Sequence, residues 1–350
     1  MSPLYVLCPG RSAGQRFALT LEFALRDRPA RILTELPGDG SLRGRRTLFA
    51  VALDEVGFNP DLGRLLADLR RTPQSLEGCT GGILVDGAGE LYTKSAAREL
   101  VLAANQAGCR FVGRPLVEAT GSLDNFAVQA RNAGCTPAEA YRLAARELAE
   151  RILAFAPERR AEPRLLVLHA SSRKTSNTLA LWGMTRERLE NCCRITEVGL
   201  RNGTLEDCGG CAYTTCLHFG ERGGCFYGGV MVQEVYPAVR ECDAIVMLCP
   251  NYNDALAANL TACINRLSAL YRTADFTGKA LFAIVVSGYS GGDIVARQLI
   301  SALSMNKGFW LPPRFCMLET ANDAGTAARL PGIGERTAAF AERIRSQLVL

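Results

Sequence analysis

The second half of the chain alternates short apolar runs with amphipathic segments. The apolar runs have the length of strands, and the segments between them place apolar residues three and four positions apart, as on one face of a helix. The run 243–249 is almost wholly apolar, which is typical of a strand covered on both faces. This alternation predicts a doubly wound α/β fold around a parallel five-stranded sheet. The predicted strands are 165–169, 195–200, 243–249, 280–287 and 315–319, and the predicted helices are 177–190, 230–240, 257–271, 293–305 and 335–348.

The first half follows a similar but less regular rhythm. A helix predicted over 137–155 ends in a polar, proline-flanked stretch at 156–163, which marks a domain boundary. We therefore expect an α/β domain over 1–160 and the doubly wound domain over 161–350. The other strands predicted in the first domain are 4–8, 47–53, 81–85 and 116–119, and its other helices are 17–26, 62–69 and 94–107.

A short stretch of weak sequence similarity, here called the internal echo, links the two halves. The segment 111–121 begins Phe-Val-Gly-Arg-Pro-Leu and ends Thr-Gly, and the segment 276–288 begins Phe-Thr-Gly-Lys-Ala-Leu and ends Ser-Gly. A single short match of this kind is as compatible with a duplicated fold as with two unrelated domains. On the first of these alternatives, the N-terminal domain is a degenerate copy of the C-terminal one.

Composition narrows the class of protein. With 48% apolar residues in 350, the chain is not disordered. Its longest apolar run, near 280–286, falls far short of the roughly 20 residues of a membrane helix. The first apolar run is interrupted by Pro9, Gly10 and Arg11, so we expect no signal peptide and a cytoplasmic location. The 40 basic and 35 acidic residues are dispersed, which predicts neither nucleic acid nor membrane as a partner.

The 14 cysteines are unevenly distributed, and in a reducing compartment they should be thiols. Cys208, Cys211, Cys216 and Cys225 fall within eighteen residues, whereas most others sit in apolar settings as small buried hydrophobes. The chain has only two histidines, which argues against a Ser-His-Asp hydrolase and a histidine-rich metal site.

Three polar loops follow predicted strands, where α/β sheets bind their ligands. The first, at 170–178, has six hydroxyl or amide side chains within residues 171–178 and opens a helix, which suits a phosphate dianion. A helix cap is the alternative interpretation of the same residues. The candidate ligands here are Ser171, Arg173, Ser176, Asn177 and Thr178.

The second and third loops suit a flat polar ring. The loop at 250–254 offers an aromatic side chain and amides, although Pro, Asn and Asp also form ordinary turns. The glycines of the loop at 287–292 permit close backbone approach. The chain has no GxxxxGK[ST] motif, so a nucleoside triphosphate site is not indicated. The candidates are Pro250, Asn251, Tyr252, Asn253, Asp254, Ser287, Gly288, Tyr289, Gly291 and Gly292.

Together these loops resemble the flavodoxin-like NADPH-dependent FMN reductase family, and within it the iron–sulfur flavoproteins. The family's first loop, G-S-x-R-x-x-S-N-T, is similar to 169–178, and its P-x-Y after a D-A-I strand is similar to 243–252. Asn265 and Arg266 stand where the family has Asp-Arg, and Thr261 replaces its usual Lys. The resemblance covers about 164–308. It implies a flavodoxin-like sheet that binds FMN, with the phosphate on the first loop and the isoalloxazine against the other two.

The four clustered cysteines lie where this family has a cysteine-rich insertion. Four thiolates on a flexible glycine-rich loop can hold a [4Fe–4S] cluster, one on each iron. The spacing here, C-x2-C-x4-C-x8-C, has longer gaps than the iron–sulfur flavoproteins show. The predicted metal ligands are Cys208, Cys211, Cys216 and Cys225, and the alternatives are a zinc site and free or redox-active thiols.

The resemblance implies an NAD(P)H-dependent FMN oxidoreductase. Electrons would pass between a donor (reduced nicotinamide or ferredoxin), FMN, a [4Fe–4S] cluster and an acceptor, which is a protein or a small molecule. One alternative is an FMN-dependent quinone, nitro or azo reductase with a zinc-bound or empty cysteine loop, and another is a cofactor-free scaffold. The sequence identifies no acid–base residue and is compatible with a homodimer. In the N-terminal domain, the loop at 9–15 has fewer hydroxyl side chains than the loop at 170–178, and the loop at 86–92 carries two carboxylates. We therefore expect any FMN site in this domain to be lost.

Overall fold

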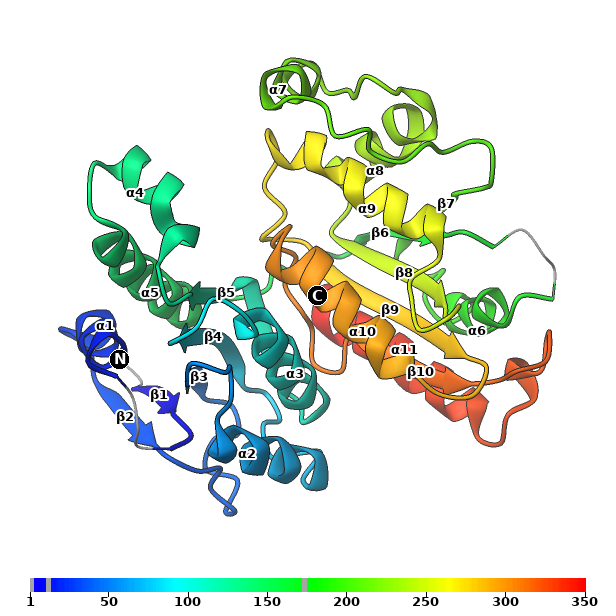
Figure 1. The fold of residues 1–350 in the computed structure, drawn as a ribbon. Coiled ribbons are helices and arrows are strands. Elements are labelled where there is room, and N and C mark those ends of the chain that lie inside the picture. Colours follow the sequence, from blue (N-terminus) through cyan, green and yellow to red (C-terminus); the bar gives the residue numbers. More distant parts are fainter. Residues whose placement is uncertain (1–2, 11–13, 172–174) are drawn as a thin grey trace. The chain divides into compact units, whose positions relative to one another are not determined.

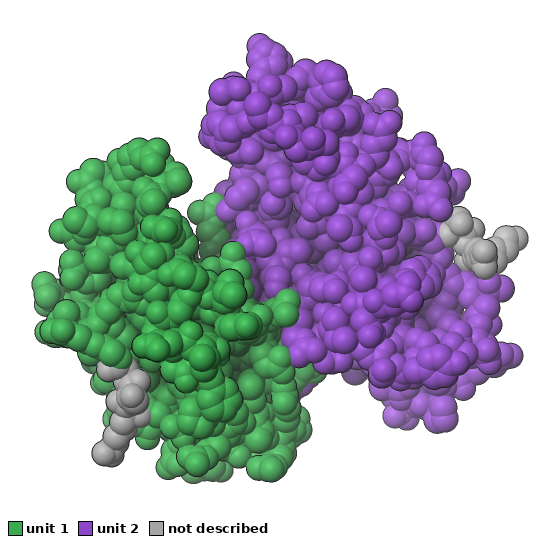
Figure 2. Space-filling view, viewed as in Figure 1, with its two compact units in different colours: residues 1–156 green, residues 157–350 purple. Residues whose placement is uncertain are grey.

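The computed structural model describes residues 3–10, 14–171 and 175–350. The chain divides into two compact units, Met1–Ala156 and Pro157–Leu350 (Figure 2). This division falls at the start of the proline-flanked stretch that follows the last helix of the first half. In the described part of the chain, no helix combines the length and the apolar character that crossing a membrane requires.

The C-terminal unit is a doubly wound sheet, as predicted. Its five parallel strands have the order β10-β9-β8-β6-β7, and helices lie on both faces (Figure 1). The central strands β8 and β9 are buried almost throughout, which explains their nearly continuous apolar sequences. The strands are β6 (Arg164–His169), β7 (Arg194–Gly199), β8 (Ala244–Pro250), β9 (Ala280–Ser287) and β10 (Cys316–Thr320).

The helices of this unit differ from the expected ones in four places. A helix over Tyr213–Glu221 lies inside the cysteine segment, where a flexible loop was expected. The predicted helices 230–240 and 293–305 each contain a π-helical turn, at Met231–Val235 and Ile300–Met305. The predicted helix 177–190 ends at Arg186. The helices are α6 (Asn177–Arg186), α7 (Tyr213–Glu221), α8 (Tyr236–Glu241), α9 (Ala258–Tyr271), α10 (Gly292–Leu299) and α11 (Ile333–Leu348), with a 3-10 turn at Ala327–Arg329.

The N-terminal unit has a sheet of the same design. Its five parallel strands have the order β2-β1-β3-β4-β5. When the strands are numbered within each unit, both sheets have the order second, first, third, fourth, fifth. The strands are β1 (Leu4–Leu7), β2 (Ala30–Leu33), β3 (Arg46–Leu53), β4 (Thr80–Gly87) and β5 (Arg110–Ala119). The helices are α1 (Gln15–Leu25), α2 (Pro60–Arg71), α3 (Thr93–Gln106), α4 (Ala127–Ala133) and α5 (Pro137–Ala154), with a 3-10 turn at Asp124–Phe126.

The internal echo noted in the sequence does not mark equivalent positions. Phe111 lies in β5, the fifth strand of its unit, whereas Phe276 precedes β9, the fourth strand of the other. The short match is therefore misleading about alignment. The likeness of the two halves rests instead on their shared strand order.

Candidate functional site

The loops that follow β8 and β9 are joined through Asn251. Its side-chain amide donates hydrogen bonds to Asp254 Oδ1 at 3.2 Å, to Ser287 Oγ at 3.2 Å and to the Ser290 carbonyl at 3.0 Å. The Asn251 Oδ1 atom is buried and has no partner among the described residues. A buried acceptor without a donor is costly, so this oxygen suits an N–H group of a ligand.

The backbone brings these two loops close together. Asn253 and Asp254 have φ of 53° and 56°, a left-handed conformation that asparagine and aspartate tolerate. Gly291 has φ of 83°, and a Cβ atom there would overlap Asp254 Oδ1. The backbone angle therefore favours glycine at position 291, and any side chain there would displace the Asp254 carboxylate.

Two tyrosines project from the same loops. The Tyr252 side chain is 63% exposed and that of Tyr289 is 80% exposed, so neither ring is packed into the protein. Pro250 ends β8, Ser287 is buried at the end of β9, and Gly288 and Gly292 flank the turn into α10. The second and third predicted loops thus meet at one edge of the sheet, at the carboxyl ends of its strands.

The first loop extends from the end of β6 to α6. Ser171 is half-buried there, whereas Arg173 lies outside the described residues. Ser176 caps α6, because its Oγ accepts a hydrogen bond from the Leu179 backbone amide at 3.4 Å. The same Ser176 Oγ lies 3.1 Å from the Thr178 hydroxyl oxygen. The cap interpretation of Ser176 is therefore correct, and the phosphate role remains a prediction.

A fourth loop, after β10, completes this edge and was not identified from the sequence. The Asn177 amide donates to the carbonyls of Ala321 and Asp323, at 3.2 and 3.0 Å, and its Oδ1 accepts from the Ala327 amide. Asn322 donates to the Tyr289 hydroxyl at 3.1 Å. This loop therefore connects the first loop to the third. Its position after the fifth strand was the signal that could have identified it.

His169 ends β6 beneath the first loop. Its Nδ1 lies 3.0 Å from the Ser171 carbonyl oxygen. Burial lowers the pKa of His169 from its ordinary value of 6.5. The imidazole is therefore neutral at pH 7.

The four clustered cysteines line one cavity of about 210 Å³, between the cysteine segment and the second half of α9. Cys216 lies on α7, so the expectation of a flexible loop is wrong at this position. Cys208 is exposed, and the other three are half-buried. Within the described residues, no three His, Cys, Asp or Glu side chains are placed to hold a metal ion.

A buried cation lies against this cavity. Arg266, on α9, is only 2% exposed. It donates to the Gly228 and Glu206 carbonyls at 2.7 and 3.4 Å, while its Nε is buried without a partner. Among the residues that the structure describes, no carboxylate pairs with it. Electrostatic interaction with the neighbouring sulfur of Cys211 raises the pKa of Tyr227, and the Arg266 guanidinium lies over the Tyr227 ring.

Residues 163–323 match the model of the NADPH-dependent FMN reductase family. The matched segment contains all five strands of the C-terminal sheet, the three predicted loops and the cysteine cavity. The match confirms the predicted enzyme class, an NAD(P)H-dependent FMN oxidoreductase. No curated protein matches the chain.

Several solved flavin reductases are similar to about half of this chain. A putative quinone reductase from Klebsiella pneumoniae is 15% identical, with 53% of this chain and 85% of that chain covered and a TM-score of 0.38. An NAD(P)H:quinone oxidoreductase from Methanothermobacter marburgensis is 14% identical, with 53% and 95% covered and a TM-score of 0.37. An FMN-dependent NADH-azoreductase from Bacillus anthracis is 12% identical, with 54% and 100% covered and a TM-score of 0.35. These scores are too low to transfer a substrate.

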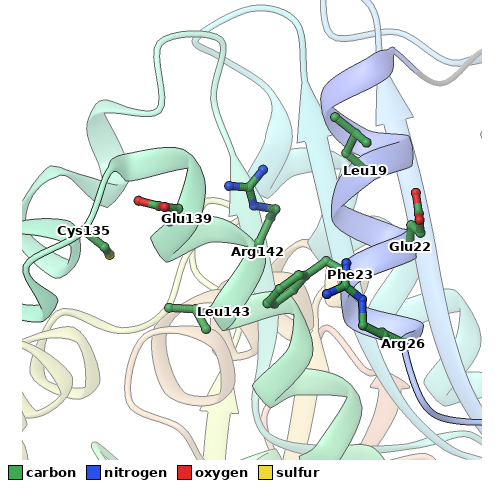
Figure 3. Close-up of a pocket in the computed structure, with 8 residues that line it drawn as sticks. All are labelled: Leu19, Glu22, Phe23, Arg26, Cys135, Glu139, Arg142 and Leu143. Carbon is green, nitrogen blue, oxygen red and sulfur yellow. The ribbon is translucent and has the colours of Figure 1, made fainter.

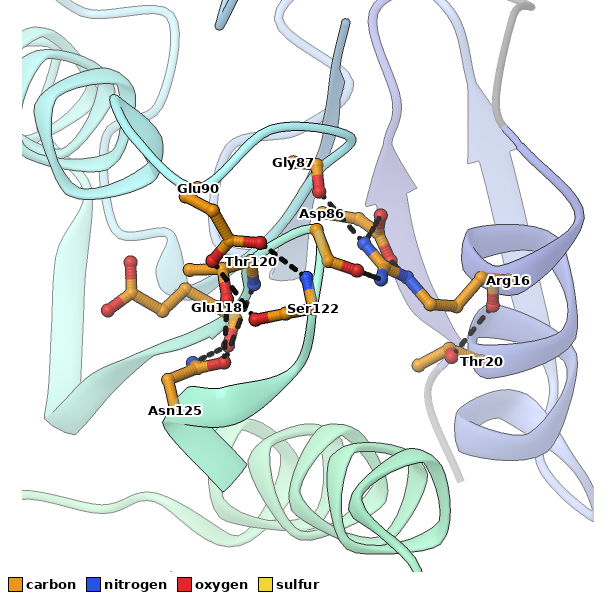
Figure 4. Close-up of polar contacts among 10 residues, drawn as sticks. Arg16, Thr20, Asp86, Gly87, Glu90, Glu118, Thr120, Ser122 and Asn125 are labelled. Carbon is orange, nitrogen blue, oxygen red and sulfur yellow. Dashed lines mark hydrogen bonds and ion pairs between the residues drawn. The ribbon is translucent and has the colours of Figure 1, made fainter. Parts of the chain in front are cut away.

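The corresponding edge of the N-terminal sheet is acidic. A cavity of about 580 Å³ lies beyond β1, β3 and β4, and its lining includes the carboxylates of Asp54, Asp61 and Asp86. Arg16 also lines it, but its guanidinium pairs with Asp86 at 2.7 Å and donates to the Gly121 carbonyl (Figure 4). Carboxylates repel a phosphate dianion, and the arginine already has an anionic partner. This lining supports the expectation that an FMN site is lost here.

A further hollow lies between α1 and α5 of the same unit (Figure 3). It has a volume of about 470 Å³ and lies on a helical face rather than at the carboxyl ends of the strands. Its side chains carry both signs of charge and do not converge on a ligand type. They are Leu19, Glu22, Phe23, Arg26, Cys135, Glu139, Arg142 and Leu143.

Proposed function

We propose that the C-terminal unit binds FMN at the carboxyl edge of its sheet and passes electrons between this flavin and a [4Fe–4S] cluster in the cysteine cavity. The match to the FMN reductase family supports a reduced nicotinamide as the donor. A ferredoxin is the alternative donor, and the acceptor is a small molecule or a redox protein. A bound flavin supplies hydride and single-electron chemistry that side chains lack.

The residues at the edge fit this cofactor. The unpartnered Oδ1 of Asn251 can accept from a ring N–H, and the exposed rings of Tyr252 and Tyr289 can pack against a flat ligand. Ser171 and Ser176 lie at the entrance to α6, where amides and hydroxyls suit a phosphate, whereas Thr178 is buried in the first turn of this helix. The buried Asn251 oxygen is the observation that carries this part of the proposal, because the described protein offers it no donor.

The cysteine cavity fits an anionic centre. Arg266 is buried and has no carboxylate partner among the described residues, so its charge favours a negatively charged group in this cavity. A [4Fe–4S] cluster takes one cysteine at each of its four irons, so its ligands are spread around a volume, and these four cysteines line one cavity. A zinc ion instead needs all four sulfurs about 2.3 Å from a single point.

Helix α9 connects the two sites. It begins four residues after Asp254 and lines the cysteine cavity with Asn265, Arg266 and Arg272. With a rise of about 1.5 Å per residue, Asn265 lies roughly 10 Å along the axis from the start of the helix at Ala258. Helix α9 therefore links the loop at 250–254 to the cysteine cavity and would fix the spacing of the two proposed sites.

Analysis of one anaerobic preparation for FMN, iron, acid-labile sulfide and zinc tests this function. We expect FMN with about four irons and four sulfides per chain. Cys208→Ser and Cys216→Ser should lose the iron and the visible absorbance of the cluster but keep FMN. Cys192→Ser, half-buried and outside the cavity, is the matched control and should keep both.

The other outcomes identify the alternatives. Zinc without iron would indicate a flavin-dependent quinone, nitro or azo reductase with a structural zinc. FMN without any metal would indicate an empty cysteine loop. A colourless protein that does not bind added FMN would indicate a scaffold and would overturn the proposal.

A further inference from the structure

One arginine contacts a sulfur of the cysteine cavity directly. Arg272, at the C-terminal end of α9, donates from its Nε to Cys216 Sγ at 3.3 Å. Cys216 lies on α7, so this hydrogen bond connects two helices.

The same guanidinium is held on a second side. It lies over the ring of Tyr213, the first residue of α7, with 4.4 Å between the Arg272 Cζ and the ring centroid. A stacked guanidinium loses little freedom on forming a hydrogen bond, because its orientation is already set. The contact with Cys216 is therefore directed rather than incidental.

Arg272 and Arg266 have different surroundings. Arg266 is buried and bonded to backbone carbonyls, so its loss would disturb the fold. Arg272 is exposed. Among the described residues, its side chain donates a hydrogen bond to Cys216 and to no other residue. Removing the Arg272 charge should therefore change the sulfur environment and leave the fold intact.

We propose that Arg272 is a positioning residue that raises the reduction potential of the metal centre through its hydrogen bond to Cys216. This inference rests on the proposed cluster. Reduction adds one electron to the centre and makes it more negative. A cationic N–H donor on a ligating sulfur stabilises that form relative to the oxidised one, since hydrogen bonds to the sulfurs and net charge set the potentials of iron–sulfur centres.

An EPR-monitored redox titration of the purified full-length holoprotein tests the proposal. For Arg272→Gln we expect the ratio of reduced to oxidised centre at a fixed ambient potential to fall about tenfold, which is about 59 mV for one electron. Arg272→Lys keeps the charge and should recover part of this shift. Arg222→Gln is the matched control, because Arg222 donates to His218 on α7 rather than to a sulfur.

The results separate the proposal from the function on which it depends. If Arg272→Gln contains wild-type iron and sulfide and titrates at the wild-type potential, the role of Arg272 is overturned while the cluster stands. An equal shift in Arg222→Gln would also overturn it, because the effect would then be that of any nearby charge. If no variant, including the wild type, contains iron, the cluster itself is wrong. Equal thermal midpoints in all variants exclude an effect of misfolding.

Discussion

The side-chain amide of Asn251 donates to the Ser287 hydroxyl at 3.2 Å, which joins the loop after β8 to the end of β9. The two residues are 36 positions apart in the chain but belong to neighbouring parallel strands. Two more hydrogen bonds from the same amide reach Asp254 and Ser290. One side chain thus holds the candidate flavin site together.

Replacing Asn251 should weaken FMN binding without unfolding the unit. Asn251→Ala removes three hydrogen bonds that shape the site, each of which contributes about 0.5–1.5 kcal/mol. We expect a loss of about 2 kcal/mol in FMN binding, or roughly thirtyfold in Kd. Titration of the apoprotein, followed by quenching of flavin fluorescence, measures this change.

Asn125→Ala is the control for Asn251→Ala. Asn125 also fixes a loop, by donating to the Glu118 carbonyl at 2.8 Å, but it lies in the N-terminal unit. It should leave the FMN affinity at the wild-type value. Equal FMN affinities in Asn251→Ala and the wild type would remove Asn251 from the site.

Gly291→Ala should be more damaging than an ordinary glycine substitution. Its φ of 83° is unfavourable for alanine, and the added Cβ would overlap Asp254 Oδ1. We expect a cost of about 1–3 kcal/mol in stability, together with weaker FMN binding. Denaturant unfolding and FMN titration of the same sample measure both effects. Gly278→Ala, where a Cβ would meet nothing within 4 Å, should change neither, and a similar loss there would refute the argument from loop approach.

The stability of the C-terminal unit should fall in mild acid because of His169. Burial lowers the pKa of this imidazole in the folded protein, whereas in the unfolded chain it stays near 6.5. Below pH 6.5 the unfolded chain therefore binds a proton that the folded chain does not, and stability declines until the pH passes the lowered folded pKa. Above pH 6.5 this contribution disappears.

His169→Gln should reduce the pH dependence between pH 7 and 5. Urea midpoints measured for the apoprotein at several pH values in this range provide the comparison. His218→Gln, at an exposed position on α7, is the control and should keep the wild-type slope. An unchanged slope in His169→Gln would assign the acid sensitivity to other groups.

The strands of the C-terminal sheet could be predicted to within about two residues, because buried parallel strands such as β8 and β9 have nearly unbroken apolar sequences. Strand β2 could not, because its four residues are largely exposed at a sheet edge and show no apolar pattern. Helix α7 was missed because its cysteine and glycine neighbours resemble a loop.

The candidate site was predictable in position but not in its internal contacts. The rule that ligands bind at strand carboxyl ends identified the loops at 250–254 and 287–292. That rule could not show that the Asn251 side chain joins these two loops. It also could not show that the Asn177 side chain hydrogen-bonds to the loop after β10 instead of pointing to a ligand. Such pairings depend on strand order, which the apolar pattern does not encode.

The acidic lining beyond β1, β3 and β4 has a consequence for stoichiometry. Two sheets with the same strand order would ordinarily offer two binding sites for the same cofactor. In the N-terminal unit, however, the carboxylates of Asp54, Asp61 and Asp86 line the corresponding cavity and would repel a phosphate dianion. Saturation with FMN should therefore occur at one equivalent per polypeptide. With one flavin per chain, substitutions in the N-terminal loops that line this cavity should leave the FMN content unchanged.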